Sequence, residues 1–172
     1  HSALGRFAHE GLVFAPTRPG RPLVCYSGDD SQNEYIYKYV SRGKYLPLLR
    51  HPSRLLDDGT LYVARFNPDG RGEWLALDLR DRAFRAACAK AGVSFADQGE
   101  VLINTRLAAD IVGATKMDRP EWGAVNPSNG EVYMTLTNNS NRVATSATPT
   151  GSQLKPDAAN PRYYEDIKGG TT

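Results

Sequence analysis

Short apolar runs bounded by turn-forming residues dominate the first part of the chain and predict β-strands. Residues 12–14 and 22–26 form two such runs, and the interval between them contains Pro16, Pro19 and Gly20, which favour a turn. We therefore expect two consecutive strands joined by a turn.

A further strand is predicted where tyrosines alternate with other residues. Tyr35, Tyr37 and Tyr39 fall on one face of this strand, and Ile36 and Val40 fall on the other. The strand follows a bend, so its start is expected to lie near the end of the strand before it.

Two β-hairpins are predicted from runs joined by turns that begin with Asn-Pro and end with Gly. The first hairpin joins residues 60–66 and 72–77, and the second joins residues 122–125 and 131–137. This repeat indicates a mainly β fold of antiparallel strands with a few helices. Units of this kind make up part of a β-propeller.

Two helices are predicted between the hairpins. One spans residues 78–91, is rich in Ala and Arg, and stops at Gly92. The other spans residues 97–113 and opens with Asp97 and Glu100, whose spacing resembles a capping box. Its apolar positions would hold the segment that follows it in place.

The remaining segments show less pattern. Residues 41–59 are expected to form an irregular connector with solvated carboxylates. Residues 144–172 are rich in Thr, Ser, Pro and Gly and are expected to form a loop or linker, which leaves residues 1–143 as the folded region. Residues 1–11 are interpreted as a loose chain end, although they contain polar candidates for a site.

Composition favours one soluble globular domain. The chain has 172 residues, 40% of them hydrophobic, and a formal net charge of +2, which does not resemble the basic field of a nucleic-acid-binding scaffold. No apolar run approaches the roughly 20 residues that span a bilayer, and no signal peptide is recognised. Cys25 and Cys88 are expected to be buried thiols, with a disulfide between them left open.

The segment at residues 114–122 carries the strongest candidate chemistry. Asp118 and Glu121 can supply oxygen ligands to a hard cation, and the guanidinium of Arg119 matches two oxygens of a phosphate. Pro120 fixes the backbone after this arginine. The alternative interpretation is that Asp118 caps the next turn and Arg119 merely pairs with Glu121 on the surface.

Other polar candidates are scattered along the chain. Asp29 lies at the bend after a predicted strand, where it is either a calcium ligand or an ordinary turn residue. Glu10 and His9 are adjacent, so on a strand only one of them can enter a given site. Arg106 can point from its helix towards the candidate site or stay solvated, and the Asn-rich segment 138–142 is either a turn or a source of amide contacts.

Several blocks taken together resemble the PhoX-type alkaline phosphatases. Among them are Gly5-Arg6-Phe7-Ala8-His9-Glu10, Ser27-Gly28-Asp29-Asp30 and the long block from Gly113 to Trp122. Further blocks in the same order lie at residues 35–38, 59–64, 104–109, 136–139 and 159–162. Their order and extent across nearly the whole chain make the resemblance far more specific than any single motif.

The resemblance implies a β-propeller phosphatase, exported to the periplasm or outside the cell, that hydrolyses phosphomonoesters with ferric iron (Fe3+) and calcium. It implies that Arg119 is the phosphate contact and that Arg119 and Glu121 are catalytic. It also implies metal ligation by Glu10, Asp29 and Glu121, and by Asp118 as a further ligand.

The chain also departs from the family pattern. The family has a cysteine with a nearby Asn-His-Glu stretch that helps to hold iron, and no such block occurs here. The family also continues past the Asn-Pro-Arg element. We therefore expect a fragment that is weak or inactive as a phosphatase by itself, with open sheet edges that pair with another chain or are covered by its own loops. The alternatives are a calcium- or phosphate-binding module without turnover and a propeller fragment used for protein interaction.

Overall fold

The computed structural model describes residues 1–67, 69–140, 142–144 and 152–154. Its centre is an antiparallel sheet of five strands in the order β1-β2-β4-β5-β6. The strands are β1 (His9–Phe14), β2 (Pro22–Asp29), β4 (Ile36–Lys44), β5 (Gly59–Phe66) and β6 (Gly72–Ala76).

Three smaller antiparallel pairs complete the strands of the described part. They are β3 (Gln32–Glu34) with β7 (Met117–Asp118), β8 (Pro120–Val125) with β9 (Val132–Leu136), and β10 (Arg142–Ala144) with β11 (Ser152–Leu154). The predicted fold class, mainly β with antiparallel strands and a few helices as in part of a β-propeller, is confirmed. Both predicted hairpins are present, as β5–β6 and β8–β9. Within the predicted linker at 144–172, the structure describes residue 144 and the strand β11. The rest of this segment lies outside the described residues.

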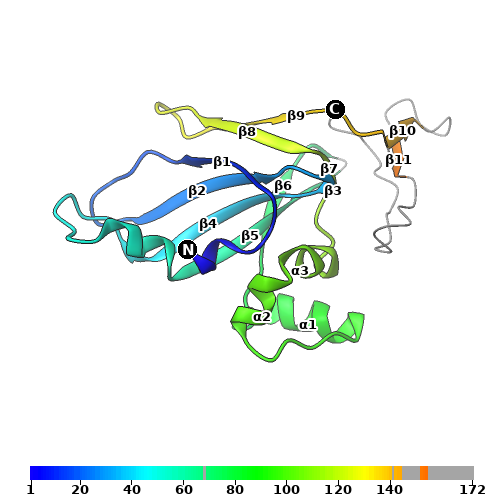
Figure 1. Cartoon of the computed structure of the whole chain (residues 1–172), viewed down its shortest axis with the longest axis horizontal. Coiled ribbons are helices and arrows are strands. Elements are labelled where there is room, and N and C mark those ends of the chain that lie inside the picture. The colour runs from blue at the N-terminus through cyan, green and yellow to red at the C-terminus, as the bar shows by residue number, and fades with distance from the viewer. Residues whose placement is uncertain (68, 141, 145–151, 155–172) are drawn as a thin grey trace.

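The central sheet is covered on both faces (Figure 1). The helices α1 to α3 lie on one side of it, and the β8–β9 hairpin lies on the other side, over β1 and β2. The contact between the layers is close at Gly28, because a Cβ atom at this position would lie 2.2 Å from the carbonyl oxygen of Pro120. The hairpin therefore sits directly against the end of β2.

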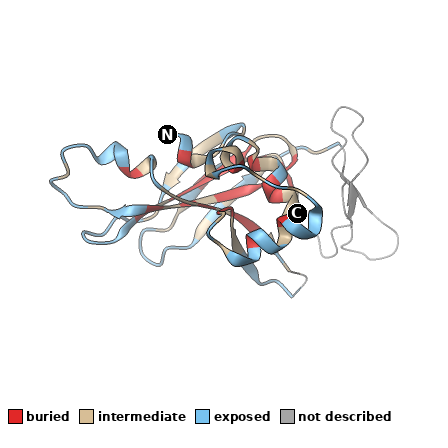
Figure 2. Ribbon diagram, turned by 90° about the horizontal axis from the view of Figure 1, so that it is seen from below, coloured by how far each residue is buried: buried red, intermediate tan, exposed pale blue. Residues whose placement is uncertain are grey.

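The tyrosine pattern predicted for β4 is confirmed. Tyr35, Tyr37 and Tyr39 are buried in the main core between the sheet and the helices, and Ile36 belongs to a second cluster on the hairpin side. Figure 2 shows the buried segments gathered along the central strands. Both thiols are free and buried, as predicted, and burial raises the pKa of Cys25 to about 12.

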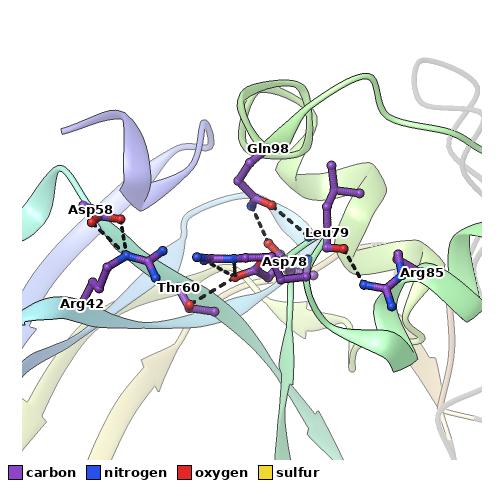
Figure 3. Close-up of polar contacts among 9 residues, drawn as sticks. Arg42, Asp58, Thr60, Asp78, Leu79, Arg85 and Gln98 are labelled. Atoms are coloured by element: carbon purple, nitrogen blue, oxygen red, sulfur yellow. Dashed lines mark hydrogen bonds and ion pairs between the residues drawn. The ribbon is translucent and has the colours of Figure 1, made fainter.

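The first predicted helix begins four residues later than expected. The helix α1 spans Arg82–Ala91, and the side chain of Asp81 caps it by accepting from the backbone N–H of Phe84. The preceding residues form a turn around Asp78, whose carboxylate accepts hydrogen bonds from Arg80 and Thr60 (Figure 3). This buried carboxylate holds the backbone outside the helix. The predicted end at Gly92 is correct, with φ of 68°.

The second predicted helix is two helices. They are α2 (Gln98–Ile103) and α3 (Thr105–Ile111), and the chain bends between them at Asn104, where ψ is 41°. Asp97 caps α2 by accepting from the N–H of Glu100, so the predicted start is correct. The bend turns α3 and its Arg106 towards the end of β2.

Two further segments are more ordered than predicted. The chain start forms the 3-10 turn η1 (Ser2–Leu4) with Ala3 buried, so this end is packed rather than loose. The connector at 41–59 contains the end of β4 and the turn η2 (Pro52–Leu56). Its Asp57 and Asp58 are exposed, as predicted. In the described part of the chain, no helix has the length and apolar character that a membrane crossing requires.

Candidate functional site

An acidic doublet at the end of β2 organises the candidate site. Asp29 closes the strand and is fully buried, and Asp30 follows it at the bend. Each carboxylate pairs with a different arginine, because Arg106 approaches Asp29 from α3 and Arg119 approaches Asp30 from the segment between β7 and β8.

The pair of Arg106 and Asp29 is bidentate. The Nε and Nη2 groups of Arg106 donate to the two oxygens of Asp29 at 2.8 and 2.7 Å. The backbone N–H of Ala8 donates to the same carboxylate at 3.1 Å. Glu34, also buried, lies 3.6 Å from Nε of Arg106. This arginine therefore stabilises two buried carboxylates and fixes the end of β2 to α3.

Arg119 has a different setting. Its side chain is 37% exposed, and its backbone φ is 48°, in the left-handed region. Its Nε lies 3.0 Å from one oxygen of Asp30, and its Nη2 donates to the other at 3.1 Å. Within the described residues, its Nη1 group makes no hydrogen bond. One edge of the guanidinium is held, and the other remains able to donate to an anion.

Glu121 lies beside the same guanidinium. Its Oε1 is 3.5 Å from Nη2 of Arg119 and accepts a hydrogen bond of 2.9 Å from the hydroxyl of Thr137. The sequence-based pairing of Arg119 with Glu121 is therefore present, but Asp30 is the closer partner. Neither Asp30 nor Thr137 was predicted as part of the site.

Asp118 is buried in the strand β7. Its Oδ1 accepts a hydrogen bond of 2.8 Å from the side-chain amide of Asn139. The same amide donates to the side chain of Asn33 at 2.9 Å. The sequence left open a plain turn or amide contacts to a metal or phosphate, and the amide contacts of Asn139 in this structure are with Asn33 and Asp118.

Glu10 and His9 lie on opposite faces of β1, as the alternation predicted. His9 contacts the side chain of Ser27 and the carbonyl oxygen of Gly5, on the core side of the sheet. Glu10 pairs in register with Gly28 and is half-buried on the side where the hairpin packs. Within the described part, its carboxylate has no hydrogen bond or ion pair.

The predicted metal ligands do not form one cluster. Arg106 binds both oxygens of Asp29, Asn139 binds Asp118, and Glu10 and Asp29 lie on opposite faces of the sheet. Among the described residues, no three His, Cys, Asp or Glu side chains gather as a metal-binding group. As arranged, the described residues therefore do not provide a complete iron or calcium ligand set.

A pocket of about 390 Å³ lies next to Arg106, between the chain start and the α2–α3 bend. Its lining residues are Arg6, Phe7, Ala8, Ile103, Asn104, Arg106 and Leu107. The charge of Arg106 is already matched by Asp29 and Glu34, so Arg6 alone adds a cation there.

Comparison with known proteins identifies a family. The family described as alkaline phosphatase PhoX matches residues 1–169. A solved structure of Pseudomonas fluorescens PhoX in complex with vanadate, a transition state analogue, has 44% sequence identity and a TM-score of 0.69. That match covers 96% of this chain and 28% of the other chain. No curated protein sequence matches.

Proposed function

The chain belongs to the alkaline phosphatase PhoX family, and from this premise we propose that it supplies part of the active site of a phosphomonoester hydrolase. Arg119 is the proposed phosphate contact. The single observation that supports this role most directly is its guanidinium, held along one edge by Asp30 while Nη1 makes no hydrogen bond within the described residues.

The held edge matters because an arginine on a flexible side chain loses conformational freedom when it binds an anion. Asp30 reduces this cost by fixing the plane of the guanidinium before phosphate arrives. The Nη1 group can then donate to a phosphoryl oxygen in a charge-assisted hydrogen bond. The structure thus favours a preorganised contact at Arg119.

Glu121 is proposed as the second catalytic residue. It lies 3.5 Å from Nη2 of Arg119, so it helps to orient the guanidinium, and Thr137 holds its carboxylate in place. Iron and calcium, with Glu10, Asp29, Asp118 and Glu121 as ligands, remain part of the proposal for the whole protein. The arrangement of the described residues does not provide that ligand set.

The setting of the whole protein follows from the family and is likewise proposed. We place it in the periplasm or outside the cell, acting on a phosphomonoester and not on nucleic acid as a scaffold. The chain covers 28% of the solved relative, so we expect the isolated chain to be weak or inactive. The edges β1 and β6 of the central sheet are available for pairing with another chain.

The test compares Arg119→Ala and Arg119→Lys with Arg65→Ala. Arg65 is a matched control, since its side chain is 38% exposed and is paired with Glu73. We expect the purified chain to bind inorganic phosphate in titration calorimetry. Arg119→Ala should lose most of this affinity, Arg119→Lys should keep part of it, and Arg65→Ala should keep all of it.

Turnover and metal content separate the classes of function. Hydrolysis of p-nitrophenyl phosphate together with bound metal, by elemental analysis, would indicate that the chain is an enzyme by itself and would refute its expected weakness. Phosphate binding without turnover fits a partial active site or a binding module. Loss of affinity in Arg65→Ala but not in Arg119→Ala, or no phosphate binding at all, would refute the assignment of Arg119.

A further inference from the structure

The segment directly after β9 holds the loop that carries Arg119. We propose that Asn139 is a positioning residue for Arg119, and this proposal rests on the proposed function, in which Arg119 binds phosphate. Asn139 donates hydrogen bonds to Asn33 and Asp118, so it acts on the arginine through the backbone around it.

The backbone at this place adopts an uncommon conformation. Arg119 and Asn33 have φ of 48° and 67°, and they are the two non-glycine residues with positive φ in the described part of the chain. Residues keep this conformation where their surroundings impose it. Something must therefore hold both positions.

The two positions lie together because β3 pairs with β7. Gln32 is in register with Asp118 and Glu34 with Met117, and the register shifts between Gln32 and Glu34. That shift falls at Asn33, while Arg119 follows directly after Asp118. The irregularity of β3 and the turn at Arg119 are thus parts of one structural feature.

Asn139 connects both sides of this feature. Its side-chain nitrogen donates to Oδ1 of Asn33 at 2.9 Å and to Oδ1 of Asp118 at 2.8 Å. Both acceptor residues are buried, so each contact is shielded from water. One amide therefore links the β3 irregularity to the residue that precedes Arg119.

Thr137 holds the other side of the loop. Its backbone N–H donates to the carbonyl oxygen of Asp118 at 2.8 Å, and its hydroxyl donates to Glu121 at 2.9 Å. Residues 137–139 consequently contact the chain before and after Arg119 and Pro120. Asn139 supplies the side-chain link on the buried side. There it can fix the backbone conformation that sets the direction of the Arg119 side chain.

The first experiment measures the affinity of the chain for inorganic phosphate in a double-mutant cycle. Asn139→Ala should weaken binding about tenfold, the effect of one hydrogen bond to a charged group. In the Arg119→Ala background it should change the residual affinity less than about twofold, because its effect passes through Arg119. Asn138→Ala is the matched control, since Asn138 is exposed, and should leave affinity unchanged.

A second measurement does not depend on phosphate binding. The Nη2 group of Arg119 donates a hydrogen bond to Asp30 at 3.1 Å, so the bonded proton should exchange slowly with water, and nitrogen-edited NMR can follow this exchange. Asn139→Ala should accelerate the exchange about tenfold or more, as expected when a hydrogen bond to a charged group is lost, and Asn138→Ala should not. Failure of the wild-type chain to bind phosphate would refute the proposed function alone. Unchanged Arg119 exchange in folded Asn139→Ala, or equal losses of affinity in both backgrounds, would overturn the positioning role.

Discussion

Removing Arg106 should destabilise the fold more than removing any exposed arginine. Arg106→Leu leaves the carboxylate of Asp29 buried, with the N–H of Ala8 as its remaining donor in the described part of the chain, and removes an ion-pair partner from buried Glu34. A buried charge that has lost its partner cannot be rehydrated without opening the end of β2.

The magnitude follows from burial. Breaking a buried ion pair by removing one partner costs about 3–5 kcal/mol. Arg106 is 35% exposed while Asp29 is 0% exposed, so water partly screens the pair and the lower end, about 3 kcal/mol, is expected. Arg42 and Asp58 form a control pair, with side chains 52% and 64% exposed. Losing that pair should cost about 0–1 kcal/mol.

Urea unfolding followed by tryptophan fluorescence gives the free energy of unfolding for each variant. Combining Arg106→Leu with Asp29→Asn should recover part of the lost stability, because the amide of Asn carries no charge. The rest of the loss should remain, because Glu34 is still without its ion pair to Arg106. Arg106→Lys should lie between wild type and Arg106→Leu, since lysine keeps the charge but not the fork. The reasoning is refuted if Arg106→Leu costs no more than Arg42→Ala.

Two further predictions concern the layers around the site. Gly28→Ala should destabilise the chain by about 1–3 kcal/mol or more in urea unfolding, and weaken phosphate binding, because its Cβ would lie 2.2 Å from the carbonyl oxygen of Pro120 and displace β8. Hydrogen bonds from Arg80 lower the pKa of Asp78, so its stabilisation is fully present above the unfolded pKa of about 4 and is lost as pH falls below that value and through the lower pKa of the folded state. Asp78→Asn should therefore flatten the acid side of the stability profile, and an unchanged slope would contradict this.

Local patterns predicted the strands well because the side chains of a strand alternate between two faces that have different surroundings. The alternation of Tyr35, Tyr37 and Tyr39 requires a strand between two environments, and the Asn-Pro turns define both hairpins. The predicted helix boundaries were wrong where a side-chain interaction or a bend overrides the local helix propensity. Asp78 holds a turn before α1, and the bend at Asn104 divides a continuous apolar pattern into α2 and α3.

The site residues were named from sequence, but their partners were not. The segment 114–122 contains both Arg119 and Glu121, which contact each other as local spacing suggested. Asp30 lies 89 positions from Arg119, and no periodic pattern encodes a pairing over that separation. The Gly-Asp-Asp bend that contains Asp30 was left open between a calcium ligand and ordinary turn chemistry, and no arginine partner was predicted for it. Only the packing of β3 against β7 brings the two together.

The acidic doublet assigns different tasks to the two arginines. Asp29 is buried and engages Arg106 through both oxygens, so this pair stabilises the junction of β2 and α3. Asp30 is partly exposed and holds one edge of Arg119, so this pair orients a cation at the surface. Because Asp29 and Asp30 are adjacent in the chain, the ion pair of Asp29 with Arg106 also fixes the position of the partly exposed Asp30. Arg106 variants should therefore lower the free energy of unfolding, and any loss of phosphate affinity should follow from that destabilisation. Arg119 variants should lower phosphate affinity with little effect on the free energy of unfolding.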